Sequence, residues 1–562
     1  MKNLELAKIL YEIADILEIQ DVQWKPRAYR KAAQSIESLN EDIEIIYEKG
    51  RLKALDNIPG VGKGISKKIA EFIETGKIKE YEKLRKKFPV EFMKIPEVGP
   101  KTAKKLYEKL KIKNIKQLKE ALKKHKLRKL YGFGEKKEKN ILEGIKFYGS
   151  NKRFLLGYIL PIARDIEGKL KTLKEVKKIS ISGSLRRMKE TIRDIDILVS
   201  SNSSRKVIDF FTKLDNVKKI IAKGSTKSSV RLKDNIQVDI RVIPDKSFGS
   251  ALQYFTGNKS HNIALRKIAI RKDLKLSEYG VFKGKKQVAG STEEGVYKKL
   301  GLKYIEPELR TDGGEIQASL KGKLPNLVKY SDLKGDFHVH TNWSDGSSSI
   351  EEMAKSAKKF GYQYLGICDH AGRLKIATCL DEKRLLKQIK EIEKVNKKFS
   401  NFEILKGAEV DILSDGKLAT SDKILKKLDI VSASIHFGFK KDNTDRILKA
   451  LENKYLNIIC HPTGRLINQR NPYKVDLRKV YKKAKENNKF LEINSYPNRL
   501  DLSDVNVKEA ISENVKIAIS TDSHNVNQLR FIELGIAVAR RGWARKKDIV
   551  NTYNLKDIKK IL

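Results

Sequence analysis

The spacing of apolar residues changes several times along the chain. Residues 1–150 carry apolar residues at helical spacing between glycine-centred turns, which predicts a helical region. Residues 151–243 combine helical stretches with short alternating runs, and residues 244–312 are mixed. From residue 335 onward, short apolar runs alternate with charged helical stretches, the order typical of βα units. A chain of 562 residues is long enough for three or four domains, and these changes in spacing predict that it is divided into several domains.

Two similar stretches occur in the helical region, at residues 58–62 (IPGVG) and 95–99 (IPEVG), with a looser copy at 131–134. Each of the first two precedes a lysine-rich amphipathic stretch. Backbone N–H groups at such a turn can bind DNA phosphates without reading the base sequence. The alternative is an ordinary turn in a helical bundle, but the repetition favours DNA binding. The stretches resemble helix-hairpin-helix motifs. The residues expected to contact DNA are Gly60, Gly62, Lys63, Gly99 and Lys101.

Three carboxylates fall on two predicted strands. Asp194 and Asp196 alternate with apolar residues, so a strand would point both to one face. A second strand, residues 237–243, puts Asp239 and Arg241 on one face, and a turn at residues 234–235 could pair it with residues 230–233. Such carboxylates can hold two Mg²⁺ ions for in-line phosphoryl transfer. The alternative is a set of surface acids.

A predicted turn with Gly183 and Ser184 precedes the first of these strands and argues against surface acids. Gly183 and Ser184 could offer N–H and hydroxyl donors to a triphosphate, and Arg187 could neutralise its charge. The order Gly-Ser-x-x-Arg, then Asp-x-Asp, resembles the nucleotidyltransferase superfamily of DNA polymerase beta. The stretch at residues 254–257 (YFTG) narrows the resemblance to the X-family DNA polymerases.

This resemblance covers about 312 residues and implies a role for each site residue. Asp194 and Asp196 would hold two Mg²⁺ or Mn²⁺ ions, and Asp239 would hold the catalytic ion beside the primer 3′-hydroxyl. The expected nucleotide contacts are Arg153, Gly183, Ser184, Arg187, Tyr254, Phe255, Gly257, Asn262 and Arg266. Of these, Tyr254 and Phe255 would discriminate against a 2′-hydroxyl. An aromatic pair can equally be core, and Arg266 can equally be a surface cation.

Lys68 matches the family position of a lysine that forms a Schiff base with an abasic sugar. Neighbouring cations would lower the pKa of an amine and suit that chemistry. The alternative is contact with a phosphate, and Trp24 and Glu80 replace basic residues of the mammalian relative. Lyase activity is therefore left open.

Six of the eight histidines lie after residue 335, and nearly every predicted strand there ends in a residue that can bind metal. The nine candidates are His338, His340, Asp345, His370, Glu409, His436, His461, Asp522 and His524. Seven strands with such ends predict a distorted (β/α)7 barrel whose site lies at the carboxyl ends of the strands. Nine nitrogen and oxygen ligands suit two or three transition metals rather than one.

This layout resembles the polymerase and histidinol phosphatase (PHP) domain. The resemblance implies phosphoester hydrolysis with two to three Mn²⁺, Zn²⁺ or Fe²⁺ ions. Beside an X-family polymerase it implies a 3′–5′ exonuclease, with abasic-site endonuclease and 3′-phosphatase as further options. Arg465 and Arg499 are candidate phosphate contacts.

Composition agrees with a nucleic-acid partner. Lys and Arg number 119 against 71 Asp and Glu, a formal charge of +48, although compositional bias explains part of this excess. No run of 18 apolar residues occurs, so no membrane span is expected, and the N-terminus reads as an amphipathic helix rather than a signal peptide. Three cysteines without a CxxC pair suggest reduced thiols and a cytoplasmic location.

The predicted fold is multidomain: a helical helix-hairpin-helix region, an α+β nucleotidyltransferase palm and a C-terminal α/β barrel. The predicted boundaries are 1–88 (DNA-binding and lyase-like), 89–150 (second helix-hairpin-helix), 151–243 (palm), 244–312 (nucleotide selection), 313–333 (linker) and 334–562 (PHP). The expected function is filling of short gaps in base excision repair. The expected partners are gapped or nicked double-stranded DNA and deoxynucleoside triphosphates, and a monomer is expected. The alternatives are a scaffold for DNA ends with one working site, and a phosphatase of small metabolites.

Overall fold

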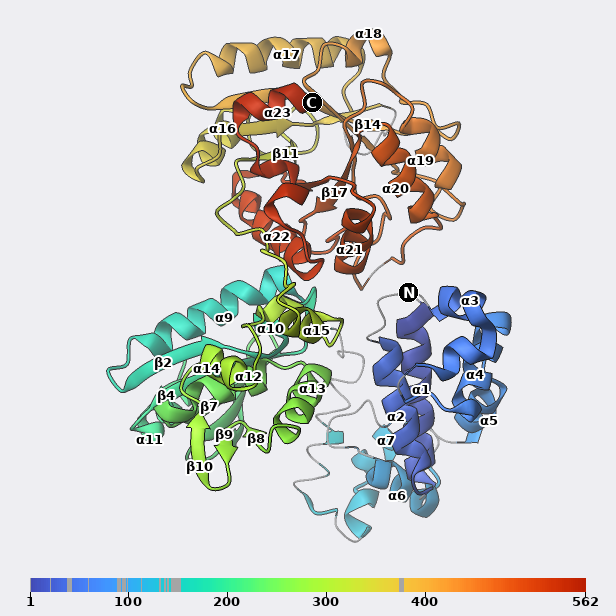
Figure 1. Ribbon diagram of the computed structural model, residues 1–562, viewed down its shortest axis with the longest axis vertical. Coiled ribbons are helices and arrows are strands. Elements are labelled where there is room, and N and C mark those ends of the chain that lie inside the picture. The colour runs from blue at the N-terminus through green and yellow to red at the C-terminus, as the bar shows by residue number, and fades with distance from the viewer. Residues whose placement is uncertain are drawn as a thin grey trace. The chain divides into compact units, whose positions relative to one another are not determined.

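A computed structural model describes the chain in two compact units, except residues 1, 21, 38–42, 59, 88–91, 93–97, 99, 113, 131–132, 136–137, 139–140, 143–152, 373–378 and 469. Unit 1 comprises Met1–Arg153 with Thr311–Gly313, and unit 2 comprises Phe154–Arg310 with Gly314–Leu562. Each unit is described by itself (Figure 1). No helix among the described residues is long and apolar enough to span a membrane.

Unit 1 is helical, as its apolar spacing predicts. One apolar core joins its first five helices, and a second core, from Phe92 to Ile141, joins the rest. The helices are α1 (Lys2–Ile19), α2 (Lys25–Glu37), α3 (Ile43–Asp56), α4 (Lys63–Thr75), α5 (Lys79–Lys87), α6 (Pro100–Leu110), α7 (Ile115–Lys123) and the 3₁₀ turn η2 (Lys126–Lys129).

The first part of unit 2 is a mixed five-stranded sheet in the order β2-β4-β7-β6-β5. Its strands are β2 (Val176–Ile181), β4 (Asp194–Ser201), β5 (Val217–Lys223), β6 (Lys227–Leu232) and β7 (Gln237–Ile243). In β4 and β7, buried apolar residues alternate with less buried polar ones, because successive side chains of a strand point to opposite faces. The predicted hairpin is present: β6 pairs with β7 in antiparallel register, and Asn235 in the turn has φ 64°. Packed with the sheet are α9 (Leu156–Lys171) and α11 (Ser204–Thr212), with the short α10 (Gly183–Arg186) and a pairing of β1 (Phe154–Leu155) with β3 (Thr191–Ile192).

A smaller helical layer follows the sheet and has a core of its own. Its elements are α12 (Phe248–Thr256), α13 (Lys259–Ile270), β8 (Lys275–Ser277), β9 (Gly280–Lys283), β10 (Lys286–Ala289), α14 (Glu293–Lys299), η4 (Pro307–Leu309) and α15 (Glu315–Leu320). The segment 313–333, expected to be a linker, contains α15 and contributes Ile316 and Leu327 to this core. A helix of six residues is too short to show a hydrophobic period, which explains the difference.

The C-terminal part is a parallel sheet of seven strands in sequential order, with the two-residue β13 (His370–Ala371) beside β14. The strands are β11 (Gly335–Val339), β12 (Tyr364–Ile367), β14 (Glu403–Asp411), β15 (Ile430–Ser434), β16 (Ile458–Ile459), β17 (Phe490–Asn494) and β18 (Ile517–Ser520). The N–H of His340 donates to the carbonyl of Ser523 at 2.7 Å, which brings the last strand beside the first. The predicted seven-stranded barrel is therefore confirmed.

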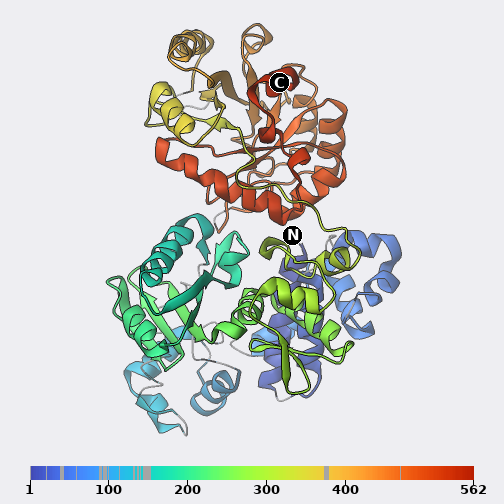
Figure 2. The same cartoon turned by 60° about the vertical axis from the view of Figure 1, so that its left-hand side comes forward.

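Helices surround this barrel on the outside (Figure 2). They are α16 (Ile350–Lys359), α17 (Glu382–Asn396), α18 (Asp422–Leu425), α19 (Thr444–Ala450), α20 (Leu477–Glu486), α21 (Asp504–Ser512), α22 (Ile532–Arg541) and α23 (Leu555–Ile561), with 3₁₀ turns at Val526–Phe531, Lys546–Asp548 and Val550–Thr552. Side-chain caps define several helix starts: Ser349 and Glu352 form a capping box on α16, and Asp381 caps α17. Cys368 and Cys460 are buried free thiols.

Candidate functional site

The three palm carboxylates meet on neighbouring strands. β4 and β7 run parallel, and Asp196 is the direct partner of Asp239, while Asp194 lies opposite Gln237. Burial, followed by the charges of Asp194 and Asp239, raises the pKa of Asp196 to about 6. Three carboxylates this close repel each other, so the arrangement favours a bound cation.

The turn before these strands approaches the carboxylates closely. Gly183 has φ +66°, and a Cβ placed on it would lie 2.2 Å from Oδ2 of Asp196. The N–H of Ser182 donates to the carbonyl of Asp196 at 2.8 Å. Glycine alone readily combines this conformation with this close approach, so the turn can present Ser184 beside the three carboxylates.

Arg187 reaches from the turn to the next layer and donates to the carbonyl of Thr256. Its neighbour Arg186, which the sequence analysis did not single out, forms two hydrogen bonds with Glu293, at 2.8 and 2.6 Å. The fully buried Arg310 also donates to Glu293, at 2.6 Å. Burial raises the pKa of Glu293, but Arg310 and Arg186 outweigh it and hold the pKa at about 2. This buried cluster fixes the turn to α14.

The predicted nucleotide-selection residues form one connected group. The rings of Tyr254 and Phe255 lie edge to face, with centroids 5.1 Å apart. Asn262 donates to the carbonyl of Tyr254 at 2.7 Å, and the guanidinium of Arg266 lies 5.8 Å from the Tyr254 ring centroid. Arg241 lies over Phe255 at 4.5 Å. The aromatic pair is only partly buried.

Gly257 follows this group at the end of α12 and has φ 67°. Arg153 is exposed and belongs to unit 1, directly before β1.

In unit 1, Gly60 has φ +86°, and Gly62 stands at the N-terminal end of α4. Gly62 and the first helical residue, Lys63, are exposed, as phosphate binding requires. Gly99 and the side chain of Lys101 lie outside the described residues.

Lys68 does not have the lowered pKa expected of a nucleophile. Its Nζ lies 2.9 Å from Oε2 of Glu80 and also donates to the carbonyl of Gly64 at 3.3 Å. Burial lowers the pKa of Lys68, but hydrogen bonds with Glu80 and Tyr29 outweigh burial, so the pKa is raised. The expected lowering by neighbouring cations is wrong here, because the carboxylate of Glu80 pairs with Lys68.

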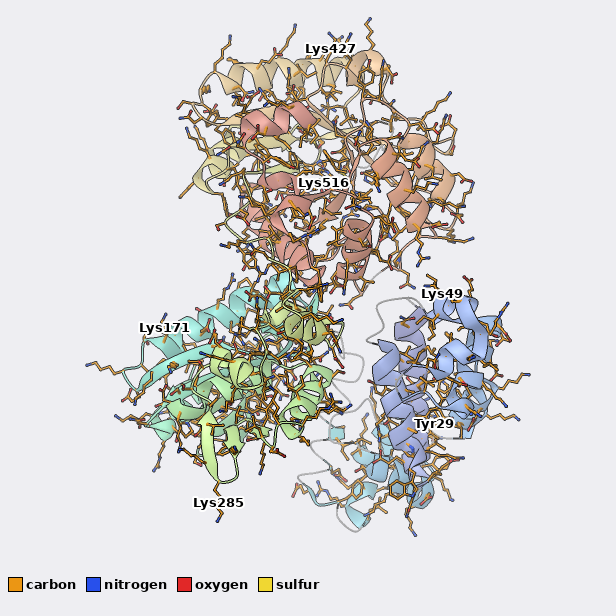
Figure 3. The ribbon with its side chains drawn as sticks, viewed as in Figure 1. Tyr29, Lys49, Lys171, Lys285, Lys427 and Lys516 are labelled. Atoms are coloured by element: carbon orange, nitrogen blue, oxygen red, sulfur yellow. The ribbon has the colours of Figure 1, made fainter. Side chains whose placement is uncertain are left out.

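Basic side chains point outward from both units. Lys49 in unit 1, and Lys171, Lys285 and Lys427 in unit 2, are examples (Figure 3). A charge spread in this way does not mark one binding face. The geometry of the turns and carboxylates therefore carries the functional argument.

The nine metal-binding candidates of the barrel form one cluster. His338 and His340 lie 3.0 Å apart through their Nε2 atoms, and His340 lies 3.1 Å from Asp522. Asp345 lies 3.5 Å from His370 and 3.3 Å from His524. Glu409 lies 2.7 Å from His370, 3.3 Å from His436 and 3.1 Å from His461. The sets of potential ligands overlap, as sites for several ions would.

The chemistry of this cluster fits metal ions. Among the described residues, Nδ1 of His340 and Nδ1 of His461 are buried atoms without a hydrogen-bond partner. Burial, with the neighbouring imidazoles, lowers the pKa of His340 to about 3, so its ring is neutral and can coordinate. Buried polar atoms without partners are costly unless something binds them, and a cation would satisfy both.

Two supporting acids were missed by the sequence analysis. Glu492 accepts a hydrogen bond from Nδ1 of His338 at 2.8 Å, and Asp411 lies 2.8 Å from Nδ1 of His436. Such partners orient metal-binding imidazoles. The available signal was Glu492 inside the apolar run 490–493, where a charged residue has no other reason to be buried.

The two arginines expected to contact phosphate behave differently. Nε of Arg499 lies 3.5 Å from Asp522, next to the cluster. Arg465 instead pairs with Glu190 of the palm, at 2.5 Å. Arg465 therefore lies at the boundary of two domains instead of facing a phosphate, because its side chain already has a carboxylate partner.

Fold and sites together define a protein that joins a nucleotidyltransferase palm to a metal-binding PHP barrel. Four family models match: "Helix-hairpin-helix domain" at residues 1–78, "SAM-like Helix-hairpin-helix tandem" at 90–146, "DNA polymerase beta thumb" at 251–311 and "PHP domain" at 336–496. A protein of Bacillus subtilis (strain 168) named DNA polymerase/3′-5′ exonuclease PolX is 39% identical over 575 residues, covering 100% of this chain and 99% of that protein. The chain belongs to the X-family DNA polymerases that carry a PHP domain.

The C-terminal part also has relatives of its own. A probable phosphatase of Thermoanaerobacter sp. (strain X514) is 35% identical over 231 residues, covering 39% of this chain and 89% of that protein. A probable phosphatase of Clostridium acetobutylicum is 31% identical over 207 residues, covering 34% of this chain and 78% of that protein. The barrel is thus similar to proteins that consist mainly of this domain.

Proposed function

We propose that this protein is a DNA polymerase that fills short gaps during base excision repair and trims 3′ ends with a 3′–5′ exonuclease. One observation carries the proposal: a carboxylate triad on paired strands and a nine-residue histidine and acid cluster occur in one chain. The name of the Bacillus subtilis relative contains both activities.

In the polymerase site, Asp194 and Asp196 would hold two Mg²⁺ or Mn²⁺ ions, and Asp239 would share one of them near the primer 3′-hydroxyl. Bound metal would make that hydroxyl more acidic and neutralise charge on the phosphates. Gly183, Ser184 and Arg187 bind the triphosphate. Tyr254, Phe255 and Gly257 pack against the sugar, and Asn262 and Arg266 check the base pair.

In the PHP site, the nine clustered residues would hold two to three Mn²⁺, Zn²⁺ or Fe²⁺ ions, which would supply an activated water for phosphoester hydrolysis. Arg499 helps to neutralise the phosphate from beside Asp522. The same chemistry suits an abasic site or a terminal 3′-phosphate, so we include both as substrates.

Substrate binding is proposed to begin in unit 1. The turn at Gly60–Gly62 and the similar sequence at residues 95–99 bind backbone phosphates of gapped or nicked DNA, with Lys63 and Lys101 as cationic contacts. A monomer suffices for this reaction, because each proposed site is assembled within one chain.

A single gel tests both activities. A duplex with a one-nucleotide gap and a labelled primer is incubated with Mn²⁺, with and without deoxynucleoside triphosphates. Extension with nucleotides and shortening without them are expected. Extension alone would overturn the exonuclease. Binding of the gapped duplex without either reaction would contradict both activities and would favour the alternative of a scaffold for DNA ends.

A further inference from the structure

The turn that carries Ser184 and Arg187 continues into a loop, Met188–Glu190, that is bonded to it. The N–H of Lys189 donates to the carbonyl of Ser184 at 3.1 Å, and the N–H of Met188 donates to the carbonyl of Leu185 at 2.9 Å. The loop is bonded on its other side too, because the N–H of Leu156, at the start of α9, donates to the carbonyl of Glu190 at 3.0 Å. A displacement of the loop therefore displaces the turn.

The side chains of this loop enter an ion cluster made with the PHP domain. Its members are Lys189, Glu190, Arg465, Asp504 and Arg541. Glu190 accepts two hydrogen bonds from Arg465, at 3.2 and 2.5 Å, and lies 3.6 Å from Arg541. Arg541 also donates to the carbonyl of Met188, and to Asp504 at 2.8 Å. Lys189 lies 3.7 Å from the same Asp504.

Both guanidinium groups of the ion cluster are hidden from water. The side chain of Arg541 is 1% exposed and that of Arg465 is 11% exposed. A buried charge is tolerated only when its partners are held in good geometry, so the cluster contributes orientation more than stability. Close packing continues beside it: a Cβ on Gly157 would lie 2.8 Å from both Leu534 and Pro497 of the PHP domain.

Arg465 also connects the cluster to the region of the PHP metal site. The same guanidinium donates to the carbonyl of Leu500. The adjacent Asp501 accepts hydrogen bonds from the N–H and hydroxyl of Thr463, at 3.0 and 2.9 Å, two residues after His461. The path from Glu190 to the metal-site loops is thus continuous.

We propose that Glu190 is a positioning residue for the incoming nucleotide. It holds the turn Gly183–Arg187 in place by bonding to Arg465 and Arg541, so the PHP domain forms a structural part of the nucleotide site. The inference rests on the proposed polymerase function. Loss of the Glu190 charge would loosen the turn and weaken triphosphate binding, while the carboxylate triad and the exonuclease ligands keep their own contacts.

The test compares Glu190→Gln with Glu533→Gln, which removes the partner of Arg164 at the same domain boundary but outside the ion cluster. For Glu190→Gln, the KM for deoxynucleotides is expected to rise roughly 5- to 20-fold with kcat within about twofold of wild type. Exonuclease activity on single-stranded DNA should be unchanged, and Glu533→Gln should match wild type in both assays. An unchanged KM, or an equal loss of both activities with a lower melting temperature, would overturn the proposal.

Two further measurements test the proposal even if the Glu190→Gln variant does not fold. Arg541→Lys keeps the charge and one contact, and should raise the KM less than Arg541→Met does. Hydrogen exchange of residues 183–190 should be faster in either variant than in wild type, and unchanged exchange would contradict the proposal. If wild type itself does not extend a primer, the polymerase function fails first, which is distinct from an active wild type with an insensitive Glu190.

Discussion

Asp196 of β4 and Asp239 of β7 are direct partners in a parallel pairing, although 43 positions separate them along the chain. Parallel neighbours present side chains of the same register to the same face, so both carboxylates point to one face of the sheet. With Asp194 two residues earlier on the same strand, they form the carboxylate triad that we propose as the site of two divalent ions.

Asp239→Ala should abolish primer extension and leave primer shortening intact, because Asp239 lies in the palm and contributes nothing to the barrel cluster. We expect extension to fall at least about 1,000-fold, since a metal ligand is lost. Asp209→Ala, which removes a surface carboxylate paired with Lys223, is the control and should extend normally. Extension by Asp239→Ala at close to the wild-type rate would show that Asp239 does not hold the catalytic metal.

Gly183→Ala should inactivate extension without unfolding the protein. A Cβ there would lie 2.2 Å from Oδ2 of Asp196, and the residue has φ +66°, so the turn must shift away from the carboxylates. Gly168→Ala on α9 meets nothing within 4 Å and should be neutral or stabilising by about 0.5–1 kcal/mol. Steady-state extension and thermal unfolding of both variants check this, and normal extension by Gly183→Ala would contradict it.

Glu293 makes the stability of unit 2 depend on pH. Its folded-state pKa is about 2, below the ordinary value of 4.5, because Arg310 and Arg186 outweigh burial. The stability it contributes is therefore present above about pH 4.5 and is lost as the pH falls towards 2. Glu293→Gln should lower the free energy of unfolding by roughly 2–3 kcal/mol at pH 7, and by less at pH 3.

Denaturant titrations at the two pH values measure this difference. Glu175→Gln, at an exposed pair with Lys206, is the matched control and should change little. A Glu293→Gln penalty equal at pH 3 and pH 7 would show that the ionised carboxylate contributes nothing beyond its shape.

His340→Gln should reduce both bound metal and exonuclease activity. His340 is fully buried between His338, His370 and His524, and its Nδ1 has no hydrogen-bond partner among the described residues. Metal content measured by mass spectrometry should fall by at least one ion per chain. His125→Gln in unit 1 removes a histidine outside the cluster and should retain wild-type metal. Full metal content in His340→Gln would remove this residue from the ligand set.

Lys68 should titrate above the ordinary lysine range, because Glu80 and Tyr29 stabilise its charged form. Glu80→Gln should therefore lower the pKa of Lys68, as measured by NMR of the methylated ε-amine. The variant should also trap more abasic DNA with borohydride at neutral pH if Lys68 is a Schiff-base nucleophile. A pKa that does not respond to Glu80→Gln would contradict the contact.

Local patterns were enough to predict both sites in outline. The alternation around Asp194 and Asp196 and the histidines at strand ends follow from the two-residue period of strands and from the way parallel strands end at one edge. The third carboxylate, Asp239, could also be predicted, because its strand shows the same alternation. Helix α15 could not be predicted, because six residues are too few to show a hydrophobic period.

The sequence by itself determined the domain types, the carboxylate triad and the set of nine candidate ligands, because each depends on the spacing of residues that are close together in the sequence. Only the tertiary structure decided the partners of the buried charges. Arg186 meets Glu293 across 107 positions, Arg465 meets Glu190 across 275, and Arg541 reaches Met188 across 353. Each of these residues looks like a surface ion in its own segment. Its partner depends on which loops the folded sheets bring together, and no periodic pattern in the sequence encodes that contact.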